Sequence, residues 1–278
     1  MPSRTEGGLR PAHQPPTMVH RPFQPNTAPI LNILIQMKNN NKSDYTINFT
    51  RKALTYLANH TSLSEPEAVK YFIAQLKTTD SYKRNLCIAY NKYCQHYRVQ
   101  WTMPKYREEA KNIALPTKEK LLMLIANARK LLSMKLTISM ETGLRPVELM
   151  RLRVKDIDLE HKTVNPTTAK GGNPRTLPIS ISLTTKIQEY IIRKNIKNTD
   201  KLFNGTADNY SKQYRQMRNN LATKLNDPSI RTIRLYDFRH YFCTKKLYEL
   251  NNPYTVMVLM GHTISNYTKI HAPTKLRR

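Results

Sequence analysis

The sequence predicts a mainly α-helical protein, in which an N-terminal helical bundle precedes a mostly helical second domain with one small antiparallel β-sheet. Apolar residues recur at helical spacing along most of the chain from about Tyr45 onward. This period changes once, between residues 156 and 180, where β-type residues alternate on both sides of the turn-rich run AKGGNP. A length of 278 residues accommodates two domains of ordinary size.

Residues 1–42 differ in composition from the rest of the chain. Seven of the 17 prolines lie before residue 30, and the stretch ends in the polar run NNNK. Such a composition buries too little apolar surface to offset the entropy of ordering, so we predict a disordered, proline-rich arm. The apolar run ILNILIQM at residues 30–37 is a candidate short docking helix within that arm.

Residues 43–102 carry the pattern of a compact helical bundle. Three segments, FTRKALTYLANH, SEPEAVKYFIAQL and SYKRNLCIAYNKYCQHYRV, each place apolar residues on one helix face. The charged run that starts at Met103 predicts a linker over residues 103–114.

The second domain is predicted for residues 115–278. Thr117 is placed to cap its first helix, a second helix ends at Gly143, and Pro146 starts a third. After the predicted hairpin, helical periodicity returns at about 182–195, 207–225, 236–250 and 253–260.

The chain is strongly basic, because 46 Lys and Arg against 19 Asp and Glu give a formal charge of +27. Such a charge requires an anionic partner: nucleic acid, an anionic membrane surface or a ribonucleoprotein. The basic residues are spread along the chain, which disfavours a polybasic membrane anchor, and no apolar run is long enough to span a bilayer. The lack of a signal-peptide pattern and three cysteines without a CxxC pair (Cys87, Cys94 and Cys243) predict a cytoplasmic protein.

Five polar residues stand where packing alone does not require them. Arg145 follows TGL at a helix start, and Lys170 lies at the tip of the hairpin. Arg239 lies in RLYDFRHYF, His262 ends LMGH, and Tyr267 follows His262 by five residues. Each alone is more often a solvated charge, a turn residue or a surface aromatic. Their order along one chain is what makes the set informative.

The series TGLRPVEL, AKGGNPRTLP, DFRHYF, LMGH and a following tyrosine resembles the tyrosine recombinase (phage integrase) family, over residues of about 43 to 271. The resemblance implies a core-binding, SAM-like helical domain followed by a catalytic domain, and it looks closest to archaeal members. It implies that Arg145 and Arg239 contact the scissile phosphate, with Glu148 supporting Arg145. Lys170 matches the general acid towards the leaving 5′ oxygen, and His262 matches a further phosphate contact.

Tyr267 is the nearest match to the family's nucleophile. It lies only five residues after His262, a shorter interval than is usual in the family. Tyr248 and Tyr254 are alternative nucleophiles, although their positions on the preceding helices favour packing roles. Tyr236 stands where the family often has a histidine, and we expect it to donate a hydrogen bond.

The physical chemistry of phosphodiester cleavage fits these roles. Arginines neutralise the growing charge on the phosphate with planar forks that stay protonated. A tyrosine, with a pKa of about 10, becomes a usable nucleophile beside that positive charge, and a lysine can protonate the leaving oxygen. His240 matches a histidine common in the second-arginine motif, and support of its helix is the simpler role. No cofactor or metal is expected, since the histidines lack a ligand spacing such as HExxH.

The sequence therefore predicts a site-specific DNA recombinase that integrates or excises a mobile element or resolves chromosomes, through a covalent 3′-phosphotyrosine. The expected partner is double-stranded DNA, bound by a homo-tetramer on two sites, with monomers or dimers in free solution and nucleoid association in the cytoplasm. Two alternatives stay open. A catalytically decayed integrase that only binds DNA explains the short interval before Tyr267, and a basic RNA-binding protein explains the charge and the 16 tyrosines.

Overall fold

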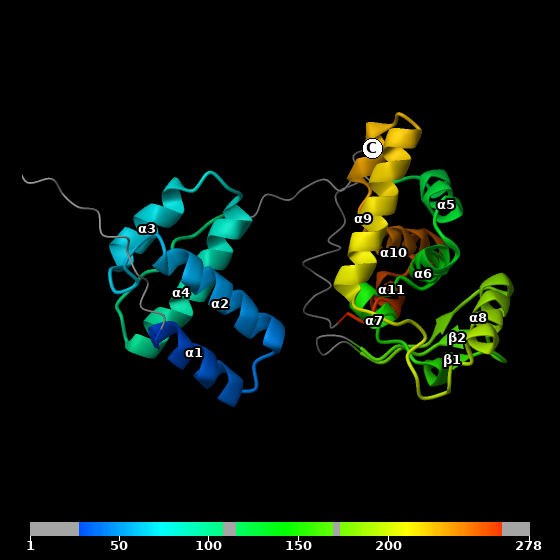
Figure 1. The fold of residues 1–278 in the computed structure, drawn as a ribbon, viewed down its shortest axis with the longest axis horizontal. Helices are drawn as coiled ribbons and strands as arrows, with labels where there is room; N and C mark the ends of the chain where they lie inside the picture. The colour runs from blue at the N-terminus through cyan, green and yellow to red at the C-terminus, as the bar shows by residue number, and fades with distance from the viewer. Residues whose placement is uncertain (1–27, 108–114, 169–172, 263–278) are drawn as a thin grey trace, which may run out of the picture. The chain divides into compact units, whose positions relative to one another are not determined.

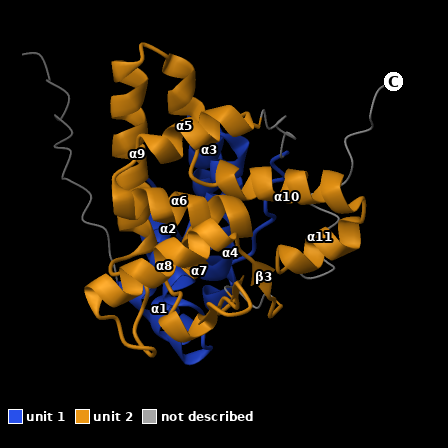
Figure 2. Cartoon of the chain, turned by 90° about the vertical axis from the view of Figure 1, so that its right-hand side faces the viewer, with its two compact units in different colours: residues 1–111 blue, residues 112–278 orange. Residues whose placement is uncertain are grey.

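The computed structural model describes residues 28–107, 115–168 and 173–262 and divides the chain into two compact units, residues 1–111 and 112–278 (Figure 1, Figure 2). Each unit has its own hydrophobic core. In the described part of the chain, no helix combines the length and the apolar character that a bilayer-spanning segment needs. The predicted fold class, mainly helical with one small antiparallel sheet, is confirmed.

Unit 1 is a helical bundle made of α1 (Ala28–Asn39), α2 (Asp44–Ala58), α3 (Pro66–Gln75) and α4 (Asp80–Tyr97). α2 packs against α1 and α4, and α3 packs against α4. The side chains of Ser43 and Thr79 cap the N-terminal ends of α2 and α4. The buried Tyr90 donates a hydrogen bond to the carbonyl oxygen of Leu63 at 2.8 Å, which ties the loop before α3 to α4.

Residues 28–39 correct the prediction of a disordered arm over residues 1–42, because they form α1. Ile30, Ile33 and Met37 lie on one face of this helix with 3%, 2% and 7% exposure. That face packs on α2 and α4, so its apolar surface offsets the entropy of ordering. The candidate docking helix is therefore part of the bundle core, and the rest of the predicted arm, residues 1–27, lies outside the described residues.

Unit 2 contains α5 (Lys118–Ala126), α6 (Lys130–Thr142), α7 (Pro146–Leu149), α8 (Ile181–Lys194), α9 (Ala207–Lys224), α10 (Asp237–Leu250) and α11 (Pro253–Leu259), with the 3₁₀ turns η1 (Val154–Asp156) and η2 (Pro228–Thr232). α6 is central, since it packs against α5, α8, α9 and α10. Leu136 and Ile138 of α6 are fully buried in this core. As predicted, Thr117 caps α5.

A three-stranded antiparallel sheet forms where the period of the sequence changes: β1 (Ile157–Asp158), β2 (Thr163–Val164) and β3 (Leu177–Pro178). β2 is the central strand, and its Val164 pairs with Ile157 on one side and Leu177 on the other. β3 also contacts α6, so the sheet packs on the helical core. The tip of the β2–β3 hairpin, residues 169–172, lies outside the described residues.

Candidate active site

Arg145 is positioned by the end of one helix and the start of the next. α6 ends at Gly143, whose φ of +63° favours glycine, and a Cβ at this position would clash with the ring of Phe242. Arg145 then adopts the extended backbone that a residue before proline prefers, because Pro146 begins α7. This turn holds Arg145 at the N-terminal end of α7, with 21% of its side chain exposed.

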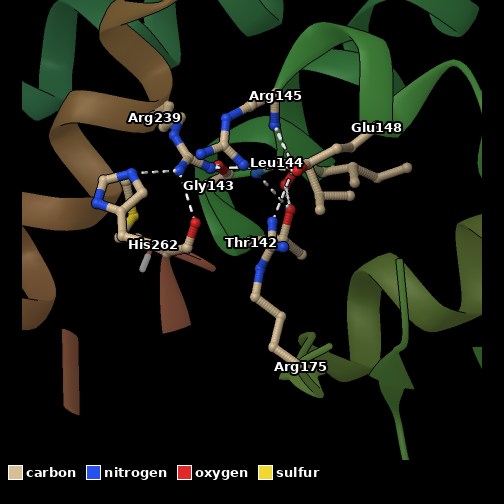
Figure 3. A network of polar contacts seen from close by, with 10 residues as sticks. Thr142, Gly143, Leu144, Arg145, Glu148, Arg175, Arg239 and His262 are labelled. Carbon is tan, nitrogen blue, oxygen red and sulfur yellow. Dashed lines mark hydrogen bonds and ion pairs between the residues drawn. The ribbon is translucent and has the colours of Figure 1, made fainter. Parts of the chain in front are cut away.

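Glu148 lies at the centre of a buried ion network (Figure 3). Its fully buried carboxylate accepts hydrogen bonds from the backbone N of Arg145 at 3.0 Å and from Nη1 of Arg145 at 2.7 Å. Its Oε2 also accepts from Nη2 of Arg175 at 2.7 Å and lies 4.0 Å from Nη1 of Arg239. One carboxylate therefore faces three guanidinium groups.

The pKa of Glu148 is lowered although the group is buried. Burial by itself raises the pKa of a carboxyl group, since it disfavours the charged form. Hydrogen bonds from the Arg145 backbone and from Arg175, together with the charge of Arg175, outweigh burial and lower the pKa of Glu148. Glu148 is thus an anion at neutral pH and orients Arg145 and Arg175.

Arg239 enters the site from the first turn of α10, with 3% of its side chain exposed. Its Nη1 donates to the carbonyl oxygen of Gly143, and its Nη2 donates to that of Met260 at 2.7 Å. Burial and the charge of Arg145 lower the pKa of Arg239 to about 10, so it stays protonated at neutral pH. Arg239 therefore joins the α6–α7 turn to the end of α11.

His262 is held by the turn that follows α11. The backbone N of His262 donates to the carbonyl oxygen of Met257 at 3.1 Å, and Gly261 between them has a φ of +62°. The His262 side chain is buried, and its Nε2 lies 3.1 Å from Nη2 of Arg239. Arg145, Arg239 and His262, which the sequence marks separately, thus converge on one site (Figure 3).

Arg175 is a residue of the site that the sequence analysis missed. Its side chain is 1% exposed, whereas an arginine beside a hairpin is usually solvated. The strand period contained a signal: Leu177 and Ile179 face the core, and Arg175 shares their register. Its Nε and Nη1 have no hydrogen-bond partner within the described ranges.

Tyr236 and His240 lie beside Arg239 at the start of α10. Tyr236 precedes the helix, is 41% exposed, and meets the ring of His240 edge-on at a centroid distance of 5.4 Å. Burial lowers the pKa of His240, although Asp237 opposes the shift, so His240 is neutral at neutral pH. The hydrogen-bonding role of Tyr236 and the supporting role of His240 stay predictions.

Lys170 and Tyr267, two of the predicted catalytic residues, lie outside the described residues. The packing roles predicted for Tyr248 and Tyr254 are wrong, since these side chains are 83% and 64% exposed. The physical reason for Tyr248 is that the buried residues of α10 end at Cys243, so the second half of the helix leaves the core.

The site carries an excess of positive charge. Arg145, Arg175 and Arg239 face the single carboxylate of Glu148. Because charges interact strongly where water is largely excluded, an additional anion stabilises such a cluster. Arg145 has the most exposed of the three side chains and is the donor that an incoming anion meets first. The arrangement is suited to binding an oxyanion such as a phosphate.

Comparison with curated proteins identifies relatives of this chain. The tyrosine recombinase XerA of Saccharolobus solfataricus is 30% identical over 149 residues, which cover 53% of this chain and 48% of the relative. The tyrosine recombinase XerA of Pyrococcus furiosus is 28% identical over 141 residues, which cover 47% and 46%. The chain thus spans about half the length of these curated relatives.

Solved structures share the fold. The Tn1549 transposon integrase in complex with transposon right end DNA is 16% identical with a TM-score of 0.64, covering 87% of this chain and 94% of that one. The XerH site-specific recombinase bound to its difH substrate is 19% identical with a TM-score of 0.62, covering 86% and 79%. The model of the phage integrase family matches residues 115–275, more than half of the chain. The chain therefore belongs to the phage integrase family of tyrosine recombinases.

Proposed function

We propose that this chain is a site-specific DNA recombinase that cuts and rejoins duplex DNA through a covalent 3′-phosphotyrosine. The observation that carries the proposal is the convergence of Arg145, Arg239 and His262 beside the buried Glu148. Charged groups are seldom buried together for packing alone, because desolvation opposes it. A phosphate bound by the three side chains accounts for their arrangement.

The proposed reaction is a transfer of the phosphate from a DNA oxygen to a tyrosine oxygen. The Tyr267 hydroxyl oxygen attacks the scissile phosphorus, and solvent water takes up its proton as the new P–O bond forms. The bond between phosphorus and the 5′ oxygen breaks, and Lys170 donates the proton that the departing oxygen takes. Attack by a 5′ hydroxyl on the phosphotyrosine reverses these steps, so rejoining needs no ATP.

In this proposal, Arg145, Arg239 and His262 stabilise the charge that develops on the non-bridging phosphate oxygens. Glu148 holds Arg145, and two backbone carbonyls hold Arg239, so both guanidinium groups are oriented before DNA arrives. Loss of one such preorganised donor typically lowers a rate by about 10²–10³-fold.

The proposal extends to the partner and the setting. Duplex DNA suits a chain of charge +27. Of the two structural relatives, the Tn1549 integrase is in complex with transposon right end DNA, and the XerH recombinase is bound to its difH substrate. Residues 28–102 act as the core-binding domain, because α1 is part of its bundle, and residues 115–278 act as the catalytic domain, with residues 103–114 as the linker. We propose a homo-tetramer on two DNA sites, associated with the nucleoid, that moves a mobile element or resolves chromosomes.

A pool of nicked duplexes with randomised sequence tests the proposal whatever the target sequence is. A nick beside the cleaved bond lets the short 5′-hydroxyl fragment diffuse away, which traps the covalent complex. We expect an adduct that survives SDS and whose DNA converges on one sequence over rounds of recovery. The adduct should disappear in Tyr267→Phe and persist in Tyr248→Phe and Tyr254→Phe, which alter exposed tyrosines. An adduct that still forms with Tyr267→Phe would show that another residue is the nucleophile.

A DNA-binding protein without cleavage is the second candidate, favoured by the interval of only five residues between His262 and Tyr267. A connection this short can misplace the tyrosine hydroxyl, and a displacement of about 1 Å can cost about 10²-fold in rate. Such a protein would enrich one sequence from the same pool when the DNA that stays non-covalently bound to it is recovered. It would form no adduct and would leave supercoiled plasmid supercoiled.

A further inference from the structure

Arg175 contacts two separate parts of the site, and Figure 3 shows the first of them, its approach to Glu148. Its Nη2 donates to Oε2 of Glu148, the third residue of α7, at 2.7 Å. Its guanidinium also packs against the turn after α11, because a Cβ at Gly261 would clash with Nη1 and lie 3.0 Å from Cζ. Leu177, two residues later, pairs with Val164 in the sheet. One side chain thus joins the hairpin, α7 and the turn that carries His262.

Asn173 provides a second link between the hairpin and that turn. Its Nδ2 donates to the carbonyl oxygen of His262 at 3.4 Å, a long and therefore weak hydrogen bond. Arg175 is buried and hydrogen-bonded to a carboxylate, so it is the stronger of the two attachments. The returning arm of the hairpin therefore meets the turn at two places, with Arg175 as the main anchor.

The burial of Arg175 is energetically unfavourable by itself. Its Nε and Nη1 are buried without hydrogen-bond partners in the described part of the chain, and such groups lose their hydration without compensation. An apolar side chain of similar volume would fill the same space without this cost. A role in holding Glu148 and the two neighbouring segments accounts for an arginine at this position.

We propose that Arg175 is a positioning residue that anchors the β2–β3 hairpin and the Gly261–His262 turn to Glu148 as one unit. Its consequence for the reaction rests on the proposed function, because the hairpin carries Lys170, five residues before Arg175, and the turn carries His262. Without Arg175, the hairpin loses its main attachment to Glu148 and the turn, and Glu148 keeps Arg145 as its close partner.

Arg175→Met tests the anchor, because methionine retains length and apolar volume but has no charge or N–H. Hydrogen exchange of the full-length protein reports on the hairpin and on the turn after α11 without requiring activity. We expect exchange to become about tenfold faster in both segments, as a structure that loses about 1.4 kcal/mol of local stability opens tenfold more often. Arg193→Met, at an exposed arginine of α8, is the matched control and should leave both segments unchanged.

Single-turnover cleavage of the recovered duplex tests the consequence for the reaction. Misplacement of catalytic groups should slow Arg175→Met on the order of 10²-fold, while duplex affinity should stay within about twofold, because only 1% of the Arg175 side chain is exposed. Arg175→Lys should recover part of the rate, since lysine keeps the charge but not the fork.

The pH profile separates positioning from a general loss of structure. Glu148 is faced by Arg145 before α7, by Arg175 before β3 and by Arg239 from α10, and Arg239 in turn contacts His262. Removal of Arg175 removes one of the groups that lower the pKa of Glu148. The fall in cleavage on acidification should therefore begin at a higher pH in Arg175→Met than in the wild type.

Gly261→Ala approaches the same contact from the other side. Its Cβ would displace the Arg175 guanidinium, whereas Gly205→Ala, also at a positive φ, would find only Cε of Met150 at 3.9 Å. Both variants carry backbone strain, so Gly205→Ala controls for it. We expect Gly261→Ala to behave like Arg175→Met, with faster hydrogen exchange in both segments and slower DNA cleavage than the wild type. Gly205→Ala should cleave DNA at the wild-type rate.

Each result decides between distinct conclusions. Wild-type exchange in both segments of Arg175→Met overturns the anchor, and faster exchange with wild-type cleavage overturns its role in the reaction. If the wild type forms no adduct with any duplex, the proposed function fails, and the exchange result alone then decides whether Arg175 is the anchor. If Arg175→Met does not fold, the same comparison is made with Arg175→Lys and Gly261→Ala.

Discussion

Among single residues, Glu148 connects the arginines of the site, since its carboxylate faces Arg145, Arg175 and Arg239. Its fully buried carboxylate binds both Arg145 and Arg175. Its two oxygens receive charged donors from Arg145, the residue before its own helix, and from Arg175, two residues before β3. Any change in its ionisation therefore alters two arginines at once.

Glu148→Gln keeps the shape of this side chain and removes its charge. We expect the free energy of unfolding at neutral pH to fall by about 3 kcal/mol, because a buried ion network loses its anion. The folded pKa of Glu148 is lowered, so its contribution is complete above the pKa of an unfolded glutamate and is lost as the pH falls through the folded pKa. Denaturant unfolding should therefore show the difference between the two proteins shrinking in acid.

Glu189→Gln, at an exposed glutamate of α8, is the control for this comparison. Surface substitutions of this kind change the free energy of unfolding by less than about 0.5 kcal/mol. A difference between wild type and Glu148→Gln that stays constant from neutral to acid pH would contradict the assignment of the lowered pKa to Glu148.

The role of Lys170 as a general acid can be tested by changing the leaving atom. A DNA thiol has a pKa near that of cysteine, about 8.5, so a bridging 5′ sulfur leaves without needing a proton. Lys170→Ala should cleave ordinary DNA about 10²–10⁴-fold more slowly and cleave sulfur-substituted DNA at nearly the wild-type rate. Arg145→Ala should be slow on both, since the phosphate charge still requires neutralisation. Equal slowing of Lys170→Ala on both substrates would exclude the general-acid role.

At the level of helices and strands, apolar periodicity predicted most of the fold, because the spacing of apolar residues determines which face of an element is buried. Gly143 and Pro146 located the turn before α7 through their backbone preferences. Apolar periodicity did not predict the convergence of Arg145, Arg239 and His262, because it does not determine which distant helices pack together. Only the family resemblance predicted that these three residues meet.

What the sequence could not reveal depends on tertiary context. The apolar run at residues 30–37 predicts a helix but not its place in the bundle, because local composition does not determine which surface covers an apolar face. Arg175 was missed because a charged residue type outweighed the strand register. The exposure of Tyr248 depends on where α10 leaves the core, which no local pattern encodes.

The corrected role of α1 gives a prediction about unit 1. Ile33 is 2% exposed, whereas Leu31 on the same helix is 57% exposed. Ile33→Ala should destabilise the bundle by about 2–5 kcal/mol through lost burial and a cavity, and Leu31→Ala by less than about 0.5 kcal/mol. Amide exchange in α2 and α4 of the full chain measures both. Equal effects would show that α1 lies outside the cooperative core.

For the whole molecule, the charge of +27 governs how it meets nucleic acid. Neutralising 6–10 phosphates releases counterions, so the affinity for a duplex should fall by about 10³–10⁵-fold between 50 and 200 mM salt. Fluorescence anisotropy with a labelled random-sequence duplex measures this slope. Tighter binding of single-stranded RNA in competition would instead favour the alternative of a basic RNA-binding protein.

The hydrogen bond from Arg239 to the carbonyl oxygen of Met260 makes the site depend on α11. During synthesis, unit 1 and the earlier helices of unit 2 are available to pack before α11 has been made. At that stage Arg239 lacks the Met260 oxygen, and His262 is not yet present. Under the proposed function, a partly synthesised chain has basic residues that attract nucleic acid but an unfinished reaction centre, and it is expected to leave DNA uncut until α11 has docked.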